Sequence, residues 1–98
     1  MLLGMKYTVR VELLEGSGDD DDALWKALRP EGFERTVPGN DGTRYRLPRG
    51  EYNYDAKATA NDVMDAAKRA AGKTGKAFRV LVTEVAGRSW HNLDIESS

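Results

Sequence analysis

The sequence contains no cysteine, and its 98 residues include a single histidine, His91, and three prolines. Without cysteine there is no disulfide, no thiol nucleophile and no thiolate metal site, and the absence is consistent with a reducing compartment. One histidine leaves too few ligands in a single chain for a zinc site or for a pair of histidines acting as acid and base. We therefore exclude the enzyme classes that depend on these groups, and we expect no cofactor and no bound metal.

An excess of either charge is also missing, because 15 Lys and Arg are balanced by 16 Asp and Glu, for a formal net charge of -1. Binding to nucleic acid must therefore rest on local basic patches rather than on the charge of the whole domain. The apolar stretch from Met1 to Met5 is far too short for a signal peptide or a membrane span. We predict a cytoplasmic protein without membrane contact, built as one domain over residues 1–98.

Two stretches show the apolar alternation of half-buried strands. Between residues 76 and 93, Phe78, Val80 and Val82 occupy every second position, so a strand turns all three to one face. Each of these side chains contributes about 1.5–3 kcal/mol when fully buried. The stretch 5–13 alternates in the same way and predicts the first strand.

Two helices are expected between these strands. The acidic run Asp19 to Asp22 precedes Leu24 and Leu28, and acidic residues at a helix start complement its free N–H groups and its dipole. Pro30 ends this helix. Thr59 caps a second helix that runs to about Ala71, and small residues let that helix lie close to a sheet. Its apolar stripe consists of Val63, Ala66, Ala67, Ala70 and Ala71.

Residues 33–37 and 43–47 are predicted as the second and third strands, joined by turn residues at 38–42. Residues 49–55 are predicted as a polar loop. The order β-α-β-β-α-β is that of the ferredoxin-like split βαβ plan, an α+β fold in which a four-stranded antiparallel sheet carries both helices on one face. The core then covers about residues 5–93, and residues 94–98 are expected to fray.

The face of this sheet that points away from the helices is predicted to be basic. The first and third strands are central neighbours in the plan, so Arg10 lies near Arg44 or Arg46 and needs Glu12, Glu34, a partner chain or a polyanion to compensate the charge. Arginines can bind phosphate with two hydrogen bonds, whereas a simple solvated sheet face is the alternative interpretation. The candidate RNA-binding arginines are Arg10, Arg44, Arg46 and Arg79.

Aromatic stacking of the kind used by sheet-type RNA modules is not expected, because Tyr7 and Tyr45 point inward. Tyr52, Tyr54 and Trp90 remain as side chains that can stack on RNA bases. The alternative for the two loop tyrosines is that they cover the core.

A polar and aromatic cluster follows the last strand. Glu84, Arg88 and His91 are its candidate catalytic residues, and His91 is the only side chain whose unperturbed pKa lies near neutrality. In the alternative interpretation Glu84 pairs with Arg88 and Trp90 packs on the sheet edge. A metal-assisted route through Asp19 to Asp22 is less favoured, because adjacent aspartates at a helix start do not converge on one point.

Several short motifs together resemble a known family. They are Tyr7–Leu13, Gly32–Thr36, Leu47–Pro48 with Glu51–Tyr52, Thr74–Lys76, Leu81–Glu84, Gly87–Arg88 and Trp90. In this combination the chain resembles the small bacterial GhoS-like family, which is named after a type V antitoxin. The resemblance implies a ferredoxin-like fold related to CRISPR-associated nucleases and, as for the named antitoxin, cleavage of the messenger RNA of a small membrane toxin.

We therefore expect an RNA-interacting protein, an endoribonuclease antitoxin of a toxin–antitoxin system, with no preference for DNA. The economical chemistry is attack of a ribose 2′-hydroxyl on its own phosphate. Arginines such as Arg10, Arg44 and Arg88 would stabilise the developing charge, and His91 or Glu84 would accept the proton.

The rival hypothesis is a non-catalytic interaction domain. In this case the open sheet face docks a second copy or another protein, through Leu81 and Val85 among the arginines. A compact dimer without RNA affinity at low salt would favour this rival.

Overall fold

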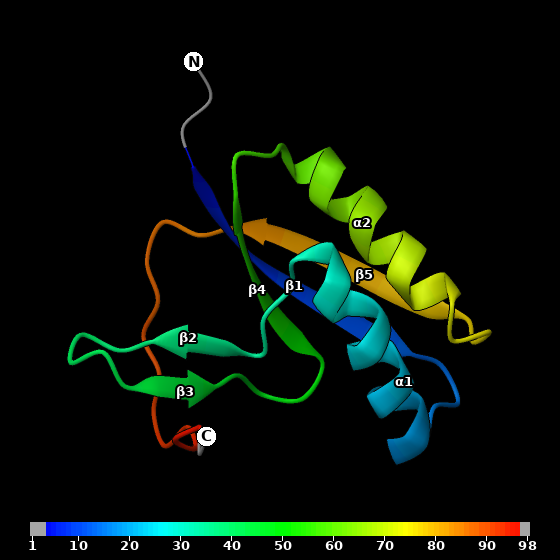
Figure 1. The fold of residues 1–98 in the computed structure, drawn as a ribbon, viewed down its shortest axis with the longest axis horizontal. Helices are drawn as coiled ribbons and strands as arrows, with labels where there is room; N and C mark the ends of the chain where they lie inside the picture. The colour runs from blue at the N-terminus through cyan, green and yellow to red at the C-terminus, as the bar shows by residue number, and fades with distance from the viewer. Residues whose placement is uncertain (1–3, 97–98) are drawn as a thin grey trace.

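The alternating stretch at the start of the chain forms β1 (Met5–Leu13), the central strand of a three-stranded antiparallel sheet in the computed structural model, which describes residues 4–96. It pairs with β4 (Glu51–Ala56) on one side and with β5 (Phe78–Glu84) on the other (Figure 1). The alternation predicted for β1 and β5 is confirmed, because Val9 is fully buried and Val82 lies opposite it.

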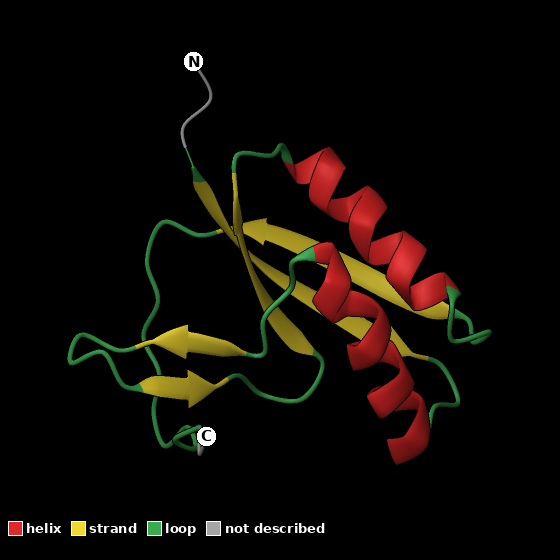
Figure 2. Ribbon diagram, viewed as in Figure 1, coloured by secondary structure: helices red, strands yellow, loops and turns green. Residues whose placement is uncertain are grey.

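Two helices cover one face of this sheet (Figure 2). They are α1 (Gly18–Leu28), extended by the short 3-10 turn η1 (Arg29–Glu31), and α2 (Ala60–Gly72). Both starts follow the predicted capping logic: the Asp20 carboxylate accepts a hydrogen bond from the Ser17 N–H at 2.8 Å, and Thr59 Oγ1 accepts one from the Asp62 N–H at 3.2 Å. Within residues 4–96, neither helix has the length and apolar character needed to cross a membrane.

The core lies between the sheet and the two helices. The small buried residues of α2, Ala67 and Ala70 among them, allow this helix to lie close to β1 and β5. The stripe predicted for α2 is buried as expected. The core side chains are Tyr7, Val9, Val11, Leu24, Leu28, Phe33, Tyr52, Val63, Ala66, Ala67, Ala70 and Ala71.

A separate hairpin stands beside the helices and the sheet. It consists of β2 (Thr36–Pro38) and β3 (Arg44–Arg46), joined by the predicted turn. In this turn Gly42 adopts a positive φ of 83°, and a Cβ on Gly39 would lie 2.7 Å from the Tyr45 ring. An isolated bridge between Glu34 and Asn53 attaches the entrance of the hairpin to β4.

The α+β class and the antiparallel pairing are confirmed, but the predicted arrangement of the strands is wrong. One neighbour of β1 is β4, which starts inside the stretch 49–55 predicted as a polar loop and ends at Ala56. Residues 43–47 instead supply β3 of the separate hairpin. The physical reason is that Tyr52 and Tyr54 alternate with polar residues in β4. A strand with this pattern turns Tyr52 onto the core.

The chain after β5 returns to the hairpin, where it ends near β3 (Figure 1). Its end lies against β3, where the Arg46 N–H donates to the Asp94 carbonyl at 2.8 Å and the Glu96 N–H donates to the Arg44 carbonyl at 2.9 Å. Residues 94–96 of the expected frayed tail thus hydrogen-bond to a strand. Residues 97 and 98 lie outside the described residues.

Candidate nucleic-acid interface

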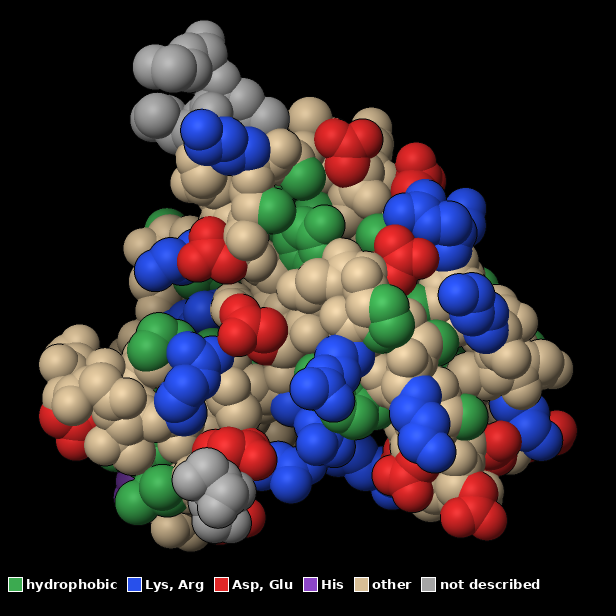
Figure 3. Space-filling view, viewed as in Figure 1, with side chains coloured by type: hydrophobic (Ala, Val, Ile, Leu, Met, Phe, Trp, Pro, Cys, Tyr) green, Lys and Arg blue, Asp and Glu red, His purple; other side chains and the backbone are tan. Residues whose placement is uncertain are grey.

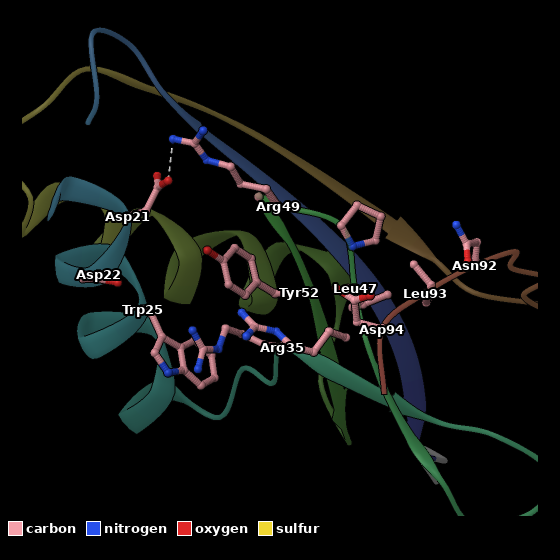
Figure 4. A pocket seen from close by; sticks show the side chains of 13 residues that line it. Asp21, Asp22, Trp25, Arg35, Leu47, Arg49, Tyr52, Asn92, Leu93 and Asp94 are labelled. Carbon is pink, nitrogen blue, oxygen red and sulfur yellow. Dashed lines mark ion pairs between the residues drawn. The ribbon is translucent and has the colours of Figure 1, made fainter. Parts of the chain in front are cut away.

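A hollow of about 470 Å³ lies where α1, the end of β3, the start of β4 and the C-terminal segment meet. Arg35, Arg46 and Arg49 line it, and we call it the arginine hollow. Figure 4 labels Arg35 and Arg49 in this cavity. Figure 3 shows basic side chains gathered around a notch on this side of the molecule. These three arginines come from different segments, so the fold rather than the local sequence brings them together.

The aromatic wall of the hollow is a stacked pair of rings. The Trp25 and Tyr52 ring centroids are 6.1 Å apart, with an angle of 8° between the planes. The Arg35 guanidinium carbon lies 4.4 Å from the Trp25 ring centroid, a cation–π distance. Among residues 4–96 Arg35 has no carboxylate partner within ion-pair distance, so its charge is available to a ligand.

The other two arginines hold weak, exposed ion pairs. Arg49 binds Asp21 at 2.5 Å, although its side chain is 74% exposed (Figure 4). Arg46 approaches Glu96 at 3.8 Å. Such exposed pairs contribute about 0–1 kcal/mol each. An anionic ligand can therefore compete for both guanidinium groups at little cost.

Tyr52 adds a buried polar group to the hollow. Its side chain is only 6% exposed, and its hydroxyl makes no hydrogen bond with residues 4–96. In the described chain, every side-chain oxygen that is fully shielded from solvent has a hydrogen-bond partner. The Tyr52 hydroxyl has none, so it is accessible from the hollow that Tyr52 lines. Burial raises the pKa of Tyr52, and Asp21 raises it further against the opposing effect of Arg35. The hydroxyl is thus neutral at pH 7 and can donate a hydrogen bond to a ligand.

A second cavity of about 480 Å³ adjoins the first. We call it the His91 pocket, and Trp90 is its aromatic side chain. Its polar lining comes from Thr8, Glu51, Arg88, Ser89 and His91. It adjoins the arginine hollow because the two cavities have wall residues in common. The shared residues are Leu47, Pro48 and Leu93.

Arg88 fastens the C-terminal segment to the open face of the sheet. Its Nη2 donates to Thr8 Oγ1 at 3.0 Å, to Asn53 Oδ1 at 2.9 Å and to the Tyr7 carbonyl at 3.2 Å. Burial lowers the pKa of Arg88, and the charge of Asp55 opposes this effect. The guanidinium therefore has a structural role, while its Nη1 is left without a hydrogen bond to residues 4–96.

The predicted catalytic residues are only partly brought together. Arg88 and His91 line one pocket. Glu84 does not join them, because it lies directly opposite Tyr7 in the strand register and shares the helix-covered face with that buried side chain. The alternative Glu84–Arg88 ion pair does not form either. The carboxylate that lies with Arg88 and His91 is Glu51, which the sequence interpretation placed in a loop without a role.

The predicted crowd of arginines on the open sheet face is wrong. Arg10 lies opposite Glu51 and Leu81, because β4 and not residues 43–47 is the neighbour of β1. Arg44 sits in the separate hairpin. The two carboxylates expected to compensate the charge do form ion pairs, Glu34 with Arg44 at 3.1 Å and Glu12 with Arg79 at 2.6 Å. Of the four predicted arginines only Arg46 lines the arginine hollow.

The predicted stacking residues are also partly occupied. Tyr52 is buried against Trp25, as the covering alternative proposed. The Tyr54 ring lies 4.7 Å from the Phe33 ring, and the Trp90 ring lies 5.5 Å from the Tyr45 ring. Trp90 is nonetheless 38% exposed and is therefore accessible to a ligand.

The acidic run at the start of α1 is not arranged as a cation site. The pKa of Asp20 is lowered mainly by the hydrogen bond from the Ser17 N–H, and Asp21 is engaged by Arg49. Within residues 4–96 no cluster of three histidine or acidic side chains is placed to hold a metal ion.

Sequence reasoning missed Trp25, Arg35 and Arg49. These residues share no spacing that indicates a common site. Only tertiary contacts place them together, namely Arg35 over the Trp25 ring and Arg49 on Asp21 of α1. The one available indication was the alternation of residues 51–56, which predicts a strand beside β1 and hence the position of Tyr52. No protein-family model and no curated protein sequence matches the chain.

Proposed function

We propose that this protein interacts with RNA and that the arginine hollow is its binding site. The observation that carries the proposal is the convergence of three guanidinium groups and the Tyr52 hydroxyl on a cavity with a stacked aromatic wall. Guanidinium groups bind phosphate with paired hydrogen bonds, and aromatic rings supply stacking surface for bases.

The hollow suits a nucleotide better than a simple anion. Its lining also contains the carboxylates of Asp21, Asp22 and Asp94, which would repel an isolated phosphate. A nucleotide combines an anionic phosphate with hydroxyl and amino donors on its ribose and base, and carboxylates accept such donors. The mixture of cationic and acidic groups is therefore favourable to a nucleotide as a whole.

The resemblance to the GhoS-like family is part of the proposal. Glu34 forms a bridge with Asn53 of β4, so the segment around Glu34 can be counted as the second strand of the plan. The order across the sheet is then the Glu34 segment, β4, β1 and β5. This is the order of the split βαβ plan, with the β2–β3 hairpin added to it. We infer a ferredoxin-like fold on this basis.

The biological role that we propose is that of a cytoplasmic endoribonuclease antitoxin acting on toxin mRNA. The His91 imidazole would accept the proton from the attacking 2′-hydroxyl as its oxygen bonds to phosphorus. The bond from phosphorus to the 5′-oxygen then breaks, the 5′-oxygen takes a proton from water, and a 2′,3′-cyclic phosphate remains. The unoccupied Nη1 of Arg88 would stabilise the phosphate charge. Glu84 has no part in this chemistry because it lies on the other face of the sheet.

The test is the affinity for a fluorescein-labelled single-stranded RNA, measured by anisotropy at several salt concentrations. We expect Arg35→Ala with Arg49→Ala to weaken binding and to reduce the slope of log K against log salt by about 0.7 for each phosphate that the variant no longer neutralises. Arg79→Ala, which removes a charge outside both cavities, is the control and should alter affinity little. Absence of RNA binding at low salt would contradict the proposal.

The second candidate function is homodimerisation, and the outer edge of β5 favours it. No strand of the described chain pairs with that edge, and Leu81 on this strand is 63% exposed. Unpaired edges readily accept a further strand. Light scattering on the wild type and on Leu81→Lys tests this candidate: a dimer that the substitution converts to monomer supports it, and a monomeric wild type rules it out.

A further inference from the structure

We infer that the ligand is a single RNA strand that runs from the arginine hollow, over the wall formed by Leu47, Pro48 and Leu93, into the His91 pocket. The two cavities are then successive nucleotide subsites of one interface. This inference rests on the proposed function, because it extends the ligand of the arginine hollow.

The arrangement of the two cavities supports a continuous path. Their volumes, about 470 and 480 Å³, fall in the range of cavities that hold small ligands. They share three wall residues, so only the segments that carry Leu47, Pro48 and Leu93 separate the arginine hollow from the His91 pocket. Each cavity offers the same pair of features, an aromatic ring and at least one arginine.

The chemistry of the second subsite also suits a nucleotide. Trp90 is fixed by Tyr45 at a centroid distance of 5.5 Å and is still 38% exposed, so its ring can stack with a base. The Arg88 side chain brings a positive charge whose described partners are all neutral acceptors. A phosphate can therefore approach this guanidinium without displacing a carboxylate from a hydrogen bond.

Glu51 sets the orientation and the type of nucleic acid. Its carboxylate lines the His91 pocket and repels phosphate, so the phosphate lies toward Arg88 and a donor group lies toward Glu51. A ribose 2′-hydroxyl is such a donor, and DNA lacks it. A duplex cannot place bases in the two cavities, since its bases are stacked inside the helix.

The two tryptophans of the chain allow each subsite to be observed separately. Trp25 lines the arginine hollow and Trp90 lines the His91 pocket, and the sequence contains no other tryptophan. In Trp90→Phe the fluorescence reports the arginine hollow alone, and in Trp25→Phe it reports the His91 pocket alone. Both substitutions keep an aromatic ring, and circular dichroism confirms that each variant is folded.

The experiment is a titration of both variants with hexauridylate and with uridine monophosphate. We expect hexauridylate to quench both tryptophans with the same dissociation constant within about twofold. We expect the monophosphate, at concentrations that saturate Trp25, to leave Trp90 unchanged. Quenching of Trp25 alone by hexauridylate overturns the inference and leaves the proposed function standing. Quenching of Trp90 alone, or of neither tryptophan, overturns both.

A pair of further variants tests the path independently of fluorescence. His91→Ala, at an exposed position, should weaken hexauridylate binding about fivefold to tenfold, which corresponds to the loss of one hydrogen bond from the imidazole to the RNA, and should leave binding of the monophosphate unchanged. Arg35→Ala should weaken the binding of both hexauridylate and the monophosphate. Equal losses for both ligands in His91→Ala would contradict two separate subsites.

Glu51→Gln should reduce the preference for hexauridylate over its DNA counterpart, and an unchanged preference would overturn the role given to Glu51.

Discussion

The sheet with its two helices and the hairpin with its C-terminal segment are held together by different forces. In the first region fully buried apolar side chains such as Val9, Leu28 and Ala67 meet between the layers. In the second region Val37 of β2 is also buried, and polar or aromatic contacts accompany it: the Arg88 hydrogen bonds, the Arg44–Glu34 ion pair and the Tyr45–Trp90 contact. Both cavities lie where the second region meets the first.

This difference indicates that the two regions have different roles. An apolar core fixes the backbone of β1, β4 and α1, and polar links then attach a segment whose surface is open to a ligand. Because polar links at a surface contribute little each, the second region is expected to loosen before the first. The following predictions break one region at a time.

The largest effect is expected in the apolar region. Leu28, at the end of α1, has no exposed surface, and Leu28→Ala should lower the free energy of unfolding by about 2–5 kcal/mol. Urea denaturation measures this change. The matched control is Leu81→Ala, at a position that is 63% exposed, where the change should stay within about 0.5 kcal/mol. Similar losses in both variants would show that the core is not where the structure places it.

Arg88→Ala should act mainly on the second region. It leaves Thr8 and the buried Asn53 without their hydrogen-bond donor, at a cost of about 1–3 kcal/mol. Hydrogen exchange should accelerate in residues 85–96 and remain slow in β1 and α2. Uniform acceleration along the chain would mean that the two regions unfold as one unit, against the comparison above. Arg79→Ala is the control, since its partner Glu12 is an exposed surface residue.

The smallest effect concerns a single surface ion pair within the first region. The pKa of Glu31 is lowered chiefly by the hydrogen bond from Arg69, which joins η1 to α2. A carboxylate with a lowered pKa in the folded state stabilises the fold above its unfolded pKa, about 4.3, and this stability is lost as the pH falls through the folded value. The urea midpoint of Glu31→Gln should therefore lie below that of the wild type at pH 7. The two midpoints should converge once the pH falls below the folded-state pKa of Glu31. A gap that persists at the lower pH would contradict the ionic origin of the effect.

The same two regions differ in how far the sequence predicts them. The positions of both helices, β1 and β5 are predicted by apolar periodicity, capping residues and Pro30. The periodicity exists because each of these elements buries one face in the core. β4 was missed since Glu51, Asn53 and Asp55 are poor strand formers and follow directly on Pro48 and Gly50. The alternation of Tyr52 and Tyr54 with polar residues is nevertheless the pattern that identifies β4 as a strand.

The candidate site was predicted least well, for a physical reason. Arg35, Arg49 and Trp25 become neighbours only through tertiary packing, so no local spacing records their proximity. The separation of Glu84 from Arg88 has a similar origin. The chain crosses from the helix-covered face to the open face between these two residues, and a change of face cannot be read from the spacing of residues that are not in a strand.

The location of RNA on the protein can be measured directly by following the amide and indole N–H resonances of nitrogen-15-labelled protein during a titration with hexauridylate. The account predicts that the largest shifts occur at the Trp25 indole and at residues 35 and 46–52, followed by residues 88–93. Shifts centred on Arg10, Arg79 and Leu81, on the open face of the sheet, would contradict it.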